Sequence, residues 1–153
     1  MDRVFLDACV LFAAAYKARA RLRRLWRLSG VKLLTSPYAC REAQSNLLEC
    51  DEQGRPKEPE PVRIEKLNRF IDLIRRMEII DDPTDCSPLE RIDLPAKDWP
   101  ILRAALEGKA THLLTTDKTH FGPYFGKRLA GVLVLSPAEY LHQRGQPSNS
   151  TGE

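Results

Sequence analysis

Residues 112–121 read His-Leu-Leu-Thr-Thr-Asp-Lys-Thr-His-Phe, a short apolar run that ends in two hydroxyls and a carboxylate. A buried parallel strand that stops at an Asp places that acid at the carboxyl edge of its sheet, where open α/β folds bind ligands. The chain begins in the same way, because residues 3–6 are mostly apolar and run directly into Asp7. Adjacent strands lie about 5 Å apart. If both strands are central, Asp7 and Asp117 are therefore expected to share one pocket.

Short strands alternate with helical patterns on both sides of these two stretches. Strands are expected at residues 3–6, 31–35, 78–80, 112–116 and 131–135, and helices at 10–28, 37–49, 62–76, 96–107 and 137–142. The first helix is expected to break near Tyr16, and Ser36-Pro37 is a helix-start signal. This alternation is typical of a three-layer α/β/α domain with a parallel sheet of about five strands.

The length of 153 residues allows one domain with a sizeable core. We expect the domain to cover residues 1–143 and the small, polar residues 144–153 to form a disordered tail. The beginning of the chain is expected to be a strand rather than a signal peptide, and no apolar run approaches the roughly 18 residues of a membrane span. The sequence therefore favours a soluble protein of the cytoplasm, without a membrane partner.

The cysteines and histidines do not form a zinc motif. No two cysteines lie two or three positions apart, and the three histidines are isolated at positions 112, 120 and 142. A disulfide framework is also unexpected in an untargeted chain of this length. Reduced, mostly packed thiols are the expected state of Cys9, Cys40, Cys50 and Cys86.

Positive charge is concentrated in the first helical pattern. The net charge is +3, and six basic residues fall within positions 17–27: Lys17, Arg19, Arg21, Arg23, Arg24 and Arg27. Taken alone, this block is more typical of a solvated helix face. Next to an acidic pocket it fits an anionic polymer, because arginines can hold phosphates while the acids hold a cation.

Four acids stand where strands end or helices begin: Asp7, Glu42, Asp98 and Asp117. Each acid taken alone can be explained by a structural role, as a helix cap, a solvated residue or a turn former. Like charges about 4 Å apart repel by about 4 kcal/mol at an effective dielectric near 20, so four gathered carboxylates need a cation. Ligation by oxygens, without His or Cys, indicates Mg²⁺ or Mn²⁺.

Such an ion promotes hydrolysis of a phosphodiester, because it polarises the phosphoryl oxygen and activates a water molecule. No nucleophile from the protein is then required. Thr115 or Thr116 could orient that water or a carboxylate, although a strand threonine that only packs is an equally good interpretation.

Four segments carry a resemblance to a known family: Val-Phe-Leu-Asp7-Ala-Cys-Val-Leu, Ser36-Pro-Tyr-Ala-Cys-Arg-Glu42, Asp98-Trp-Pro-Ile-Leu-Arg-Ala-Ala-Leu, and Ala-Thr-His-Leu-Leu-Thr115-Thr-Asp117-Lys-Thr-His-Phe. In order and spacing they resemble the four acidic motifs of the PIN-domain ribonucleases, over residues 3 to about 141. The resemblance implies that the four acids bind Mg²⁺ or Mn²⁺ and that Thr115 is the hydroxyl preceding the last acid. It also implies endonucleolytic cleavage of RNA.

The resemblance further implies a biological setting. Many short, single-domain bacterial members are VapC-like toxins of toxin–antitoxin pairs, held inactive by a small partner protein and often dimeric.

Two positions differ from the family pattern. Cys9 stands where an Asn is usual, and Lys118, Thr119 and His120 occupy a turn that sometimes carries a further Asp or Asn. The number of bound ions therefore stays open. For His120, a capping or packing role is favoured over a phosphate contact.

The sequence thus predicts a metal-dependent endoribonuclease, with the role of a toxin, whose Arg21, Arg24 and Lys118 contact the RNA backbone. A non-catalytic RNA-binding or regulatory domain is one alternative, and retention of all four acids argues against it. A phosphatase or phospho-receiver is another. Such sites generally need a second acid close to the first Asp or a matching Lys after a later strand, and no acid follows Asp7 closely.

Overall fold

The computed structural model describes residues 1–89 and 91–145. The strands are β1 (Asp2–Leu6), β2 (Val31–Thr35), β3 (Glu78–Ile79), β4 (His112–Leu114), β5 (Arg128–Leu129) and β6 (Val132–Leu135). The α-helices are α1 (Ala8–Tyr16), α2 (Pro37–Leu47), α3 (Glu60–Arg75), α4 (Trp99–Glu107), α5 (Lys118–Phe121) and α6 (Pro137–Gln143). Three 3-10 helices lie between them: η1 (Arg21–Arg27), η2 (Ala96–Asp98) and η3 (Gly122–Tyr124).

The strands form one sheet in the order β3-β2-β1-β4-β6-β5. All neighbouring pairs are parallel except β5 with β6, which is antiparallel. The outermost strands, β3 and β5, contain two residues each. β1 and β4 are neighbours at the centre, with Leu6 opposite Leu114. The mostly parallel α/β fold is confirmed, with six strands where about five were expected.

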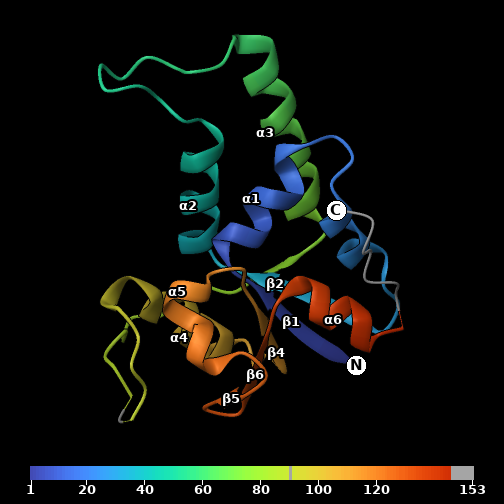
Figure 1. Ribbon diagram of the computed structural model, residues 1–153, viewed down its shortest axis with the longest axis vertical. Coiled ribbons are helices and arrows are strands. Elements are labelled where there is room, and N and C mark those ends of the chain that lie inside the picture. The colour runs from blue at the N-terminus through green and yellow to red at the C-terminus, as the bar shows by residue number, and fades with distance from the viewer. Residues whose placement is uncertain (90, 146–153) are drawn as a thin grey trace.

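Helices cover both faces of this sheet. The connections from β1 to β3 and from β3 to β4 cross the sheet in opposite directions, and right-handed crossovers then place their helices on opposite faces. Figure 1 shows α1, α2 and α3 gathered on one side of the strands and α4 on the other. Val4, Phe5 and Leu6 of β1 are fully buried, as expected for a central strand with helices on both faces of the sheet.

Short-range signals set the helix boundaries near the site. The hydroxyl of Ser36 accepts a hydrogen bond from the backbone N–H of Ala39, and Pro37 opens α2. At α6, the side chains of Ser136 and Glu139 form a reciprocal capping box. These boundaries agree with the helices expected from the sequence.

Three segments differ from the expectation. The first helix ends at Tyr16, where a break was expected, but the basic stretch after it forms the 3-10 helix η1 rather than an α-helix. The expected irregular turn after Asp117 contains α5, η3 and the unpredicted strand β5. Arg144, expected in a disordered tail, donates a hydrogen bond of 2.6 Å to the carbonyl of Ser29. Residues 146–153 of that tail lie outside the described residues, and the domain boundary at residue 143 stays a prediction.

No helix within residues 1–89 and 91–145 is both long and apolar enough to cross a bilayer.

Candidate metal centre

The carboxyl ends of β1 and β4 bring Asp7 and Thr115 together. Each residue directly follows its strand, and the N–H of Asp7 donates to the carbonyl of Leu114 at 3.1 Å. The hydroxyl of Thr115 then donates to Asp7 Oδ2 at 2.8 Å. The expected meeting of two strand ends is therefore present, and the threonine hydroxyl fixes the first acid.

The carboxylate of Asp7 is almost fully enclosed, with 6% of the residue exposed. Its Oδ1 accepts the N–H of Ala8 at 2.7 Å and so caps α1, while the thiol of Cys9 lies 3.7 Å from Oδ2. Burial raises the pKa of Asp7 to about 6, against the opposing effect of its hydrogen bonds, and the charges of Glu42 and Asp98 raise it further. The surroundings therefore disfavour an ionised Asp7 unless a cation is present.

Asp98 reaches the same edge from the end of η2, just before α4. Its side chain does not cap that helix, so the simplest structural role for a helix-start Asp does not apply. Only 8% of the residue is exposed, and burial raises its pKa, with the charge of Asp117 acting in the same direction and that of His120 against it. Atom Oδ2 of Asp98 is buried and, within the described part of the chain, has no hydrogen-bond partner.

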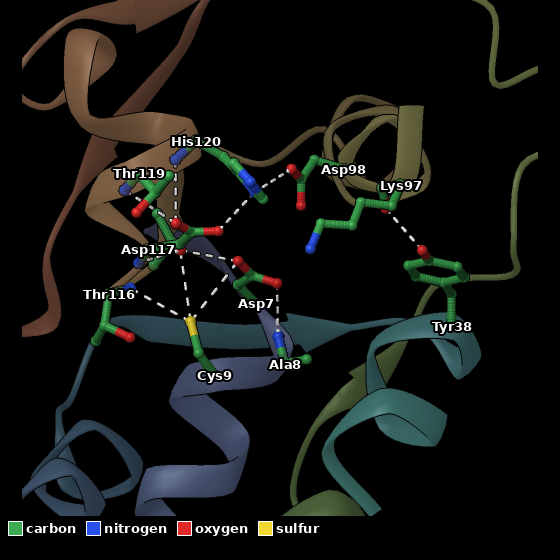
Figure 2. Close-up of polar contacts among 11 residues, drawn as sticks. Asp7, Ala8, Cys9, Tyr38, Lys97, Asp98, Thr116, Asp117, Thr119 and His120 are labelled. Carbon is green, nitrogen blue, oxygen red and sulfur yellow. Dashed lines mark hydrogen bonds and ion pairs between the residues drawn. The ribbon is translucent and has the colours of Figure 1, made fainter. Parts of the chain in front are cut away.

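Asp117 caps α5 and faces Asp98. Its Oδ1 accepts the backbone N–H groups of Thr119 at 3.1 Å and His120 at 3.0 Å, and its own N–H donates to Thr115 Oγ1 at 3.1 Å. Thr115 therefore links Asp117 to Asp7. The second oxygen, Oδ2, points toward the imidazole of His120, as Figure 2 shows.

The imidazole of His120 lies between two acids. Its Nδ1 is 2.8 Å from Asp98 Oδ2 and 2.9 Å from Asp117 Oδ2. One potential ligand atom from each of these three residues lies within 4.8 Å of the others. Asp7 and Glu42 are outside this close group. The structure thus gathers two of the four expected acids tightly, together with a histidine for which a capping or packing role was expected.

Glu42 lies at the rim of the site. It is an exposed residue of α2, yet its charge contributes to raising the pKa values of both Asp7 and Tyr38, after the larger effect of burial. It is therefore electrostatically coupled to Asp7 although it lies outside the close group.

The predicted RNA-binding residues divide into two groups. Lys118 is exposed and directly follows Asp117. Arg21 and Arg24 belong to η1, which follows the far end of α1, about 13 Å along the nine-residue helix from Asp7. The indole N–H of Trp26 holds η1 to α3 by donating to the carbonyl of Leu73 at 3.1 Å.

Lys97 and Tyr38 also border the site, and sequence reasoning missed both. The hydroxyl of Tyr38 donates to the carbonyl of Lys97 at 2.6 Å. Figure 2 shows the Lys97 side chain lying between Tyr38 and Asp98, with its ammonium group near the acids. Its charge contributes to lowering the pKa of Asp98, against burial. The position of Lys97 beside Asp98 in the chain is the only sequence signal, and it does not fix the direction of the side chain.

The residues at this edge fit a divalent cation. Carboxylate oxygens are ligands for Mg²⁺ and Mn²⁺, and an imidazole nitrogen adds a donor for transition metals. A buried carboxylate oxygen without a hydrogen bond, as Asp98 Oδ2 is within the described residues, is costly unless a positive charge satisfies it. The donor set and this orphaned atom therefore agree with metal binding.

Comparison with known proteins gives one family. A model described as "PIN domain" matches residues 3–119. In fold, the chain is similar to a crystal structure of VapBC2 from Rickettsia felis bound to a DNA fragment from their promoter. That match has a TM-score of 0.58 and 16% identity, and covers 88% of this chain and 98% of that chain. VapBC-1 from nontypeable Haemophilus influenzae matches with a TM-score of 0.52, 13% identity and the same coverage of 88% and 98%. No curated protein sequence matches.

Proposed function

The chain belongs to the PIN-domain family, and from this premise we propose that it is a Mg²⁺- or Mn²⁺-dependent endoribonuclease. The observation that carries the proposal is the buried Oδ2 of Asp98, which has no hydrogen-bond partner among residues 1–89 and 91–145 and lies 2.8 Å from the imidazole that also contacts Asp117. A chain that only bound RNA would have no use for acids buried from water as Asp7 and Asp98 are. These acids instead provide the negative charge that a divalent ion needs.

Each acid has a separate task in the proposed site. Asp98 and Asp117 hold the ion, Asp7 completes the charge from the end of β1, and Glu42 extends it from the rim. Thr115 fixes two of these groups at once, because it donates to Asp7 and accepts from the N–H of Asp117. When bound, the ion supplies a Lewis acid for a phosphoryl oxygen and lowers the pKa of a water molecule.

Lys97 and Lys118, the lysines beside the acids in the chain, bind the phosphate backbone of the RNA. Both are exposed and lie next to Asp98 and Asp117 in the chain. Their ammonium groups attract and orient the phosphates on either side of the scissile bond. Arg21 and Arg24 lie farther away and contact phosphates elsewhere on a longer RNA.

The biological role that we propose is that of the toxin in a toxin–antitoxin pair, acting in the cytoplasm and inhibited by a small antitoxin. The shared fold with two VapBC complexes supports this role. A homodimer is part of the proposal. Expression of the chain alone should stop bacterial growth, and expression with the product of the adjacent gene should restore it.

Cleavage of a structured RNA tests the activity. The purified full chain is incubated with EDTA, Mg²⁺ or Mn²⁺, alongside Asp98→Asn and the matched control Asp72→Asn, which changes an exposed acid of α3. We expect cleavage only with a divalent ion, a loss of about 100-fold in Asp98→Asn and wild-type activity in the control. Equal cleavage by all three proteins would indicate a contaminating nuclease. RNA binding without cleavage under either ion would replace the proposal by a non-catalytic RNA-binding role.

A further inference from the structure

The imidazole of His120 faces the two acids that are closest to each other in the proposed centre. We propose that His120 Nδ1 is itself a ligand of the ion held by Asp98 and Asp117, and that this nitrogen makes the centre select a first-row transition-metal ion such as Mn²⁺ over Mg²⁺. The proposal rests on the proposed function, because it concerns the same site. It differs from the expected set of oxygen ligands alone.

The distances from His120 Nδ1 to the two carboxylates match those between neighbouring ligands of one ion. Nδ1 of His120 lies 2.8 Å and 2.9 Å from the Oδ2 atoms of Asp98 and Asp117. Neighbouring ligands of an octahedral ion with bonds of about 2.1 Å are about 3.0 Å apart. His120 Nδ1 therefore lies at this separation from both carboxylates, and one ligand atom from each of the three residues lies within 4.8 Å of the others.

Two of these atoms lack a hydrogen bond of regular geometry within the described residues. Neither Nδ1 of His120 nor Oδ2 of Asp98 has a hydrogen-bond partner among residues 1–89 and 91–145, although both atoms are buried. Asp98 as a residue is 8% exposed, so water has little access to it. In the proposed site, a cation shared by His120 and the two carboxylates satisfies both atoms.

The backbone holds His120 in this position. Its N–H donates to Oδ1 of Asp117, the N-cap of α5, at 3.0 Å, and this capping bond keeps the two residues together at the start of the helix. The next residue, Phe121, is fully buried and anchors the segment in the core. The imidazole is thus arranged before any ion arrives, which reduces the entropic cost of binding.

The nitrogen ligand determines which ion is preferred. Mg²⁺ prefers oxygen ligands in near-ideal octahedral geometry and retains several waters. Affinity for imidazole-containing sites rises along the first transition series from Mn²⁺ upward. One imidazole with two carboxylates therefore favours Mn²⁺ and its heavier neighbours over Mg²⁺.

Metal binding without RNA tests the inference. The metal-free full chain is titrated with Mn²⁺ and followed by the electron paramagnetic resonance of the free ion, with Mg²⁺ as competitor. The variants are His120→Gln and the matched control His142→Gln, an exposed histidine of α6. We expect His120→Gln to weaken Mn²⁺ binding about tenfold or more, to change Mg²⁺ binding much less, and the control to change neither.

Pulsed paramagnetic resonance of the Mn²⁺-loaded protein detects the nitrogen directly. Coupling to ¹⁴N of an imidazole is expected in the wild type and the control but not in His120→Gln, and metal-free melting curves establish that the variant is folded. Absence of this coupling in the wild type, equal loss of both ions in His120→Gln, or no Mn²⁺ binding would overturn the inference. If the protein cleaves RNA but shows no nitrogen coupling, the role of His120 as a ligand is refuted and the proposed nuclease activity is not. If it shows nitrogen coupling but does not cleave RNA, the nuclease activity is refuted and the ligand role is not.

Discussion

Replacing Asp7 with Asn is expected to stabilise the metal-free protein while it removes cleavage. The folded chain raises the pKa of Asp7 from 3.8 to about 6, chiefly by burial. For an acid, a raised folded pKa means that the unfolded chain ionises first, so the contribution of Asp7 to stability is lost as the pH rises from about 4 through 6. At about 1.4 kcal/mol for each pKa unit, ionised Asp7 costs the folded state about 3 kcal/mol above pH 7.

The Asn side chain avoids this cost and retains the shape of Asp7. Its oxygen can still accept the N–H of Ala8, and its amide group can donate to the hydroxyl of Thr115. In EDTA at pH 8 we expect Asp7→Asn to unfold about 6–12 °C above the wild type. At pH 5 the wild type is more protonated, and the difference should fall to about half. Saturating Mn²⁺ should raise the Tm of the wild type more than that of the variant.

Differential scanning fluorimetry at pH 5 and pH 8, with EDTA or Mn²⁺, measures these differences. Asp72→Asn removes the same charge from an exposed position and should change the free energy of unfolding by less than about 0.5 kcal/mol. The reasoning is refuted if Asp7→Asn is less stable than the wild type at pH 8 in EDTA. A stability difference that does not shrink toward pH 5 would also contradict it.

Three other substitutions separate substrate binding from stability. Lys97→Met should raise the KM for RNA more than it lowers kcat and reduce the dependence of log KM on log salt by about one, measured by steady-state cleavage at several salt concentrations. Thr115→Val should lower the free energy of unfolding in urea by about 1–3 kcal/mol, because the N–H of Asp117 loses its partner, and Thr115→Ser should not. Tyr140→Phe should cost about 1 kcal/mol by removing the 2.6 Å hydrogen bond to Asp2, with RNA cleavage unchanged.

Much of the fold follows from local signals. The strand at residues 31–35 was predicted with the bounds observed, and the following helix with its start at Pro37, because a buried apolar run and a capping Ser precede a Pro. The 3-10 form of η1 was not predicted. Leu22, Leu25 and Leu28 recur every three residues, and this spacing is compatible with both an α-helix and a 3-10 helix.

The strand β5 was missed for a different reason. It contains two residues, too few to show an alternating pattern, and its hairpin turns through Ala130 and Gly131, both with positive φ. Hairpin turns of this kind usually carry Asn or Asp before Gly, so an Ala in that place does not predict a hairpin.

The candidate site was predictable only where strands end. The positions of Asp7 and Asp117 follow from two strand termini, which are neighbours in the sheet. The approach of Asp98 to His120 could not be inferred, because Asp98 arrives after a loop that begins near Asp81 and has no periodic pattern to fix its path. Side-chain directions such as that of Lys97 depend on the same path.

The two outermost strands restrict how copies of this protein can associate. β3 and β5 each offer only two residues at the borders of the sheet. Such short borders give a foreign strand little to pair with, which protects against continuous intermolecular sheets and fibrils. Any stable assembly of the described part of the chain, whether with a second copy or with an antitoxin, is therefore expected to be built through side chains on helical surfaces rather than by strand addition.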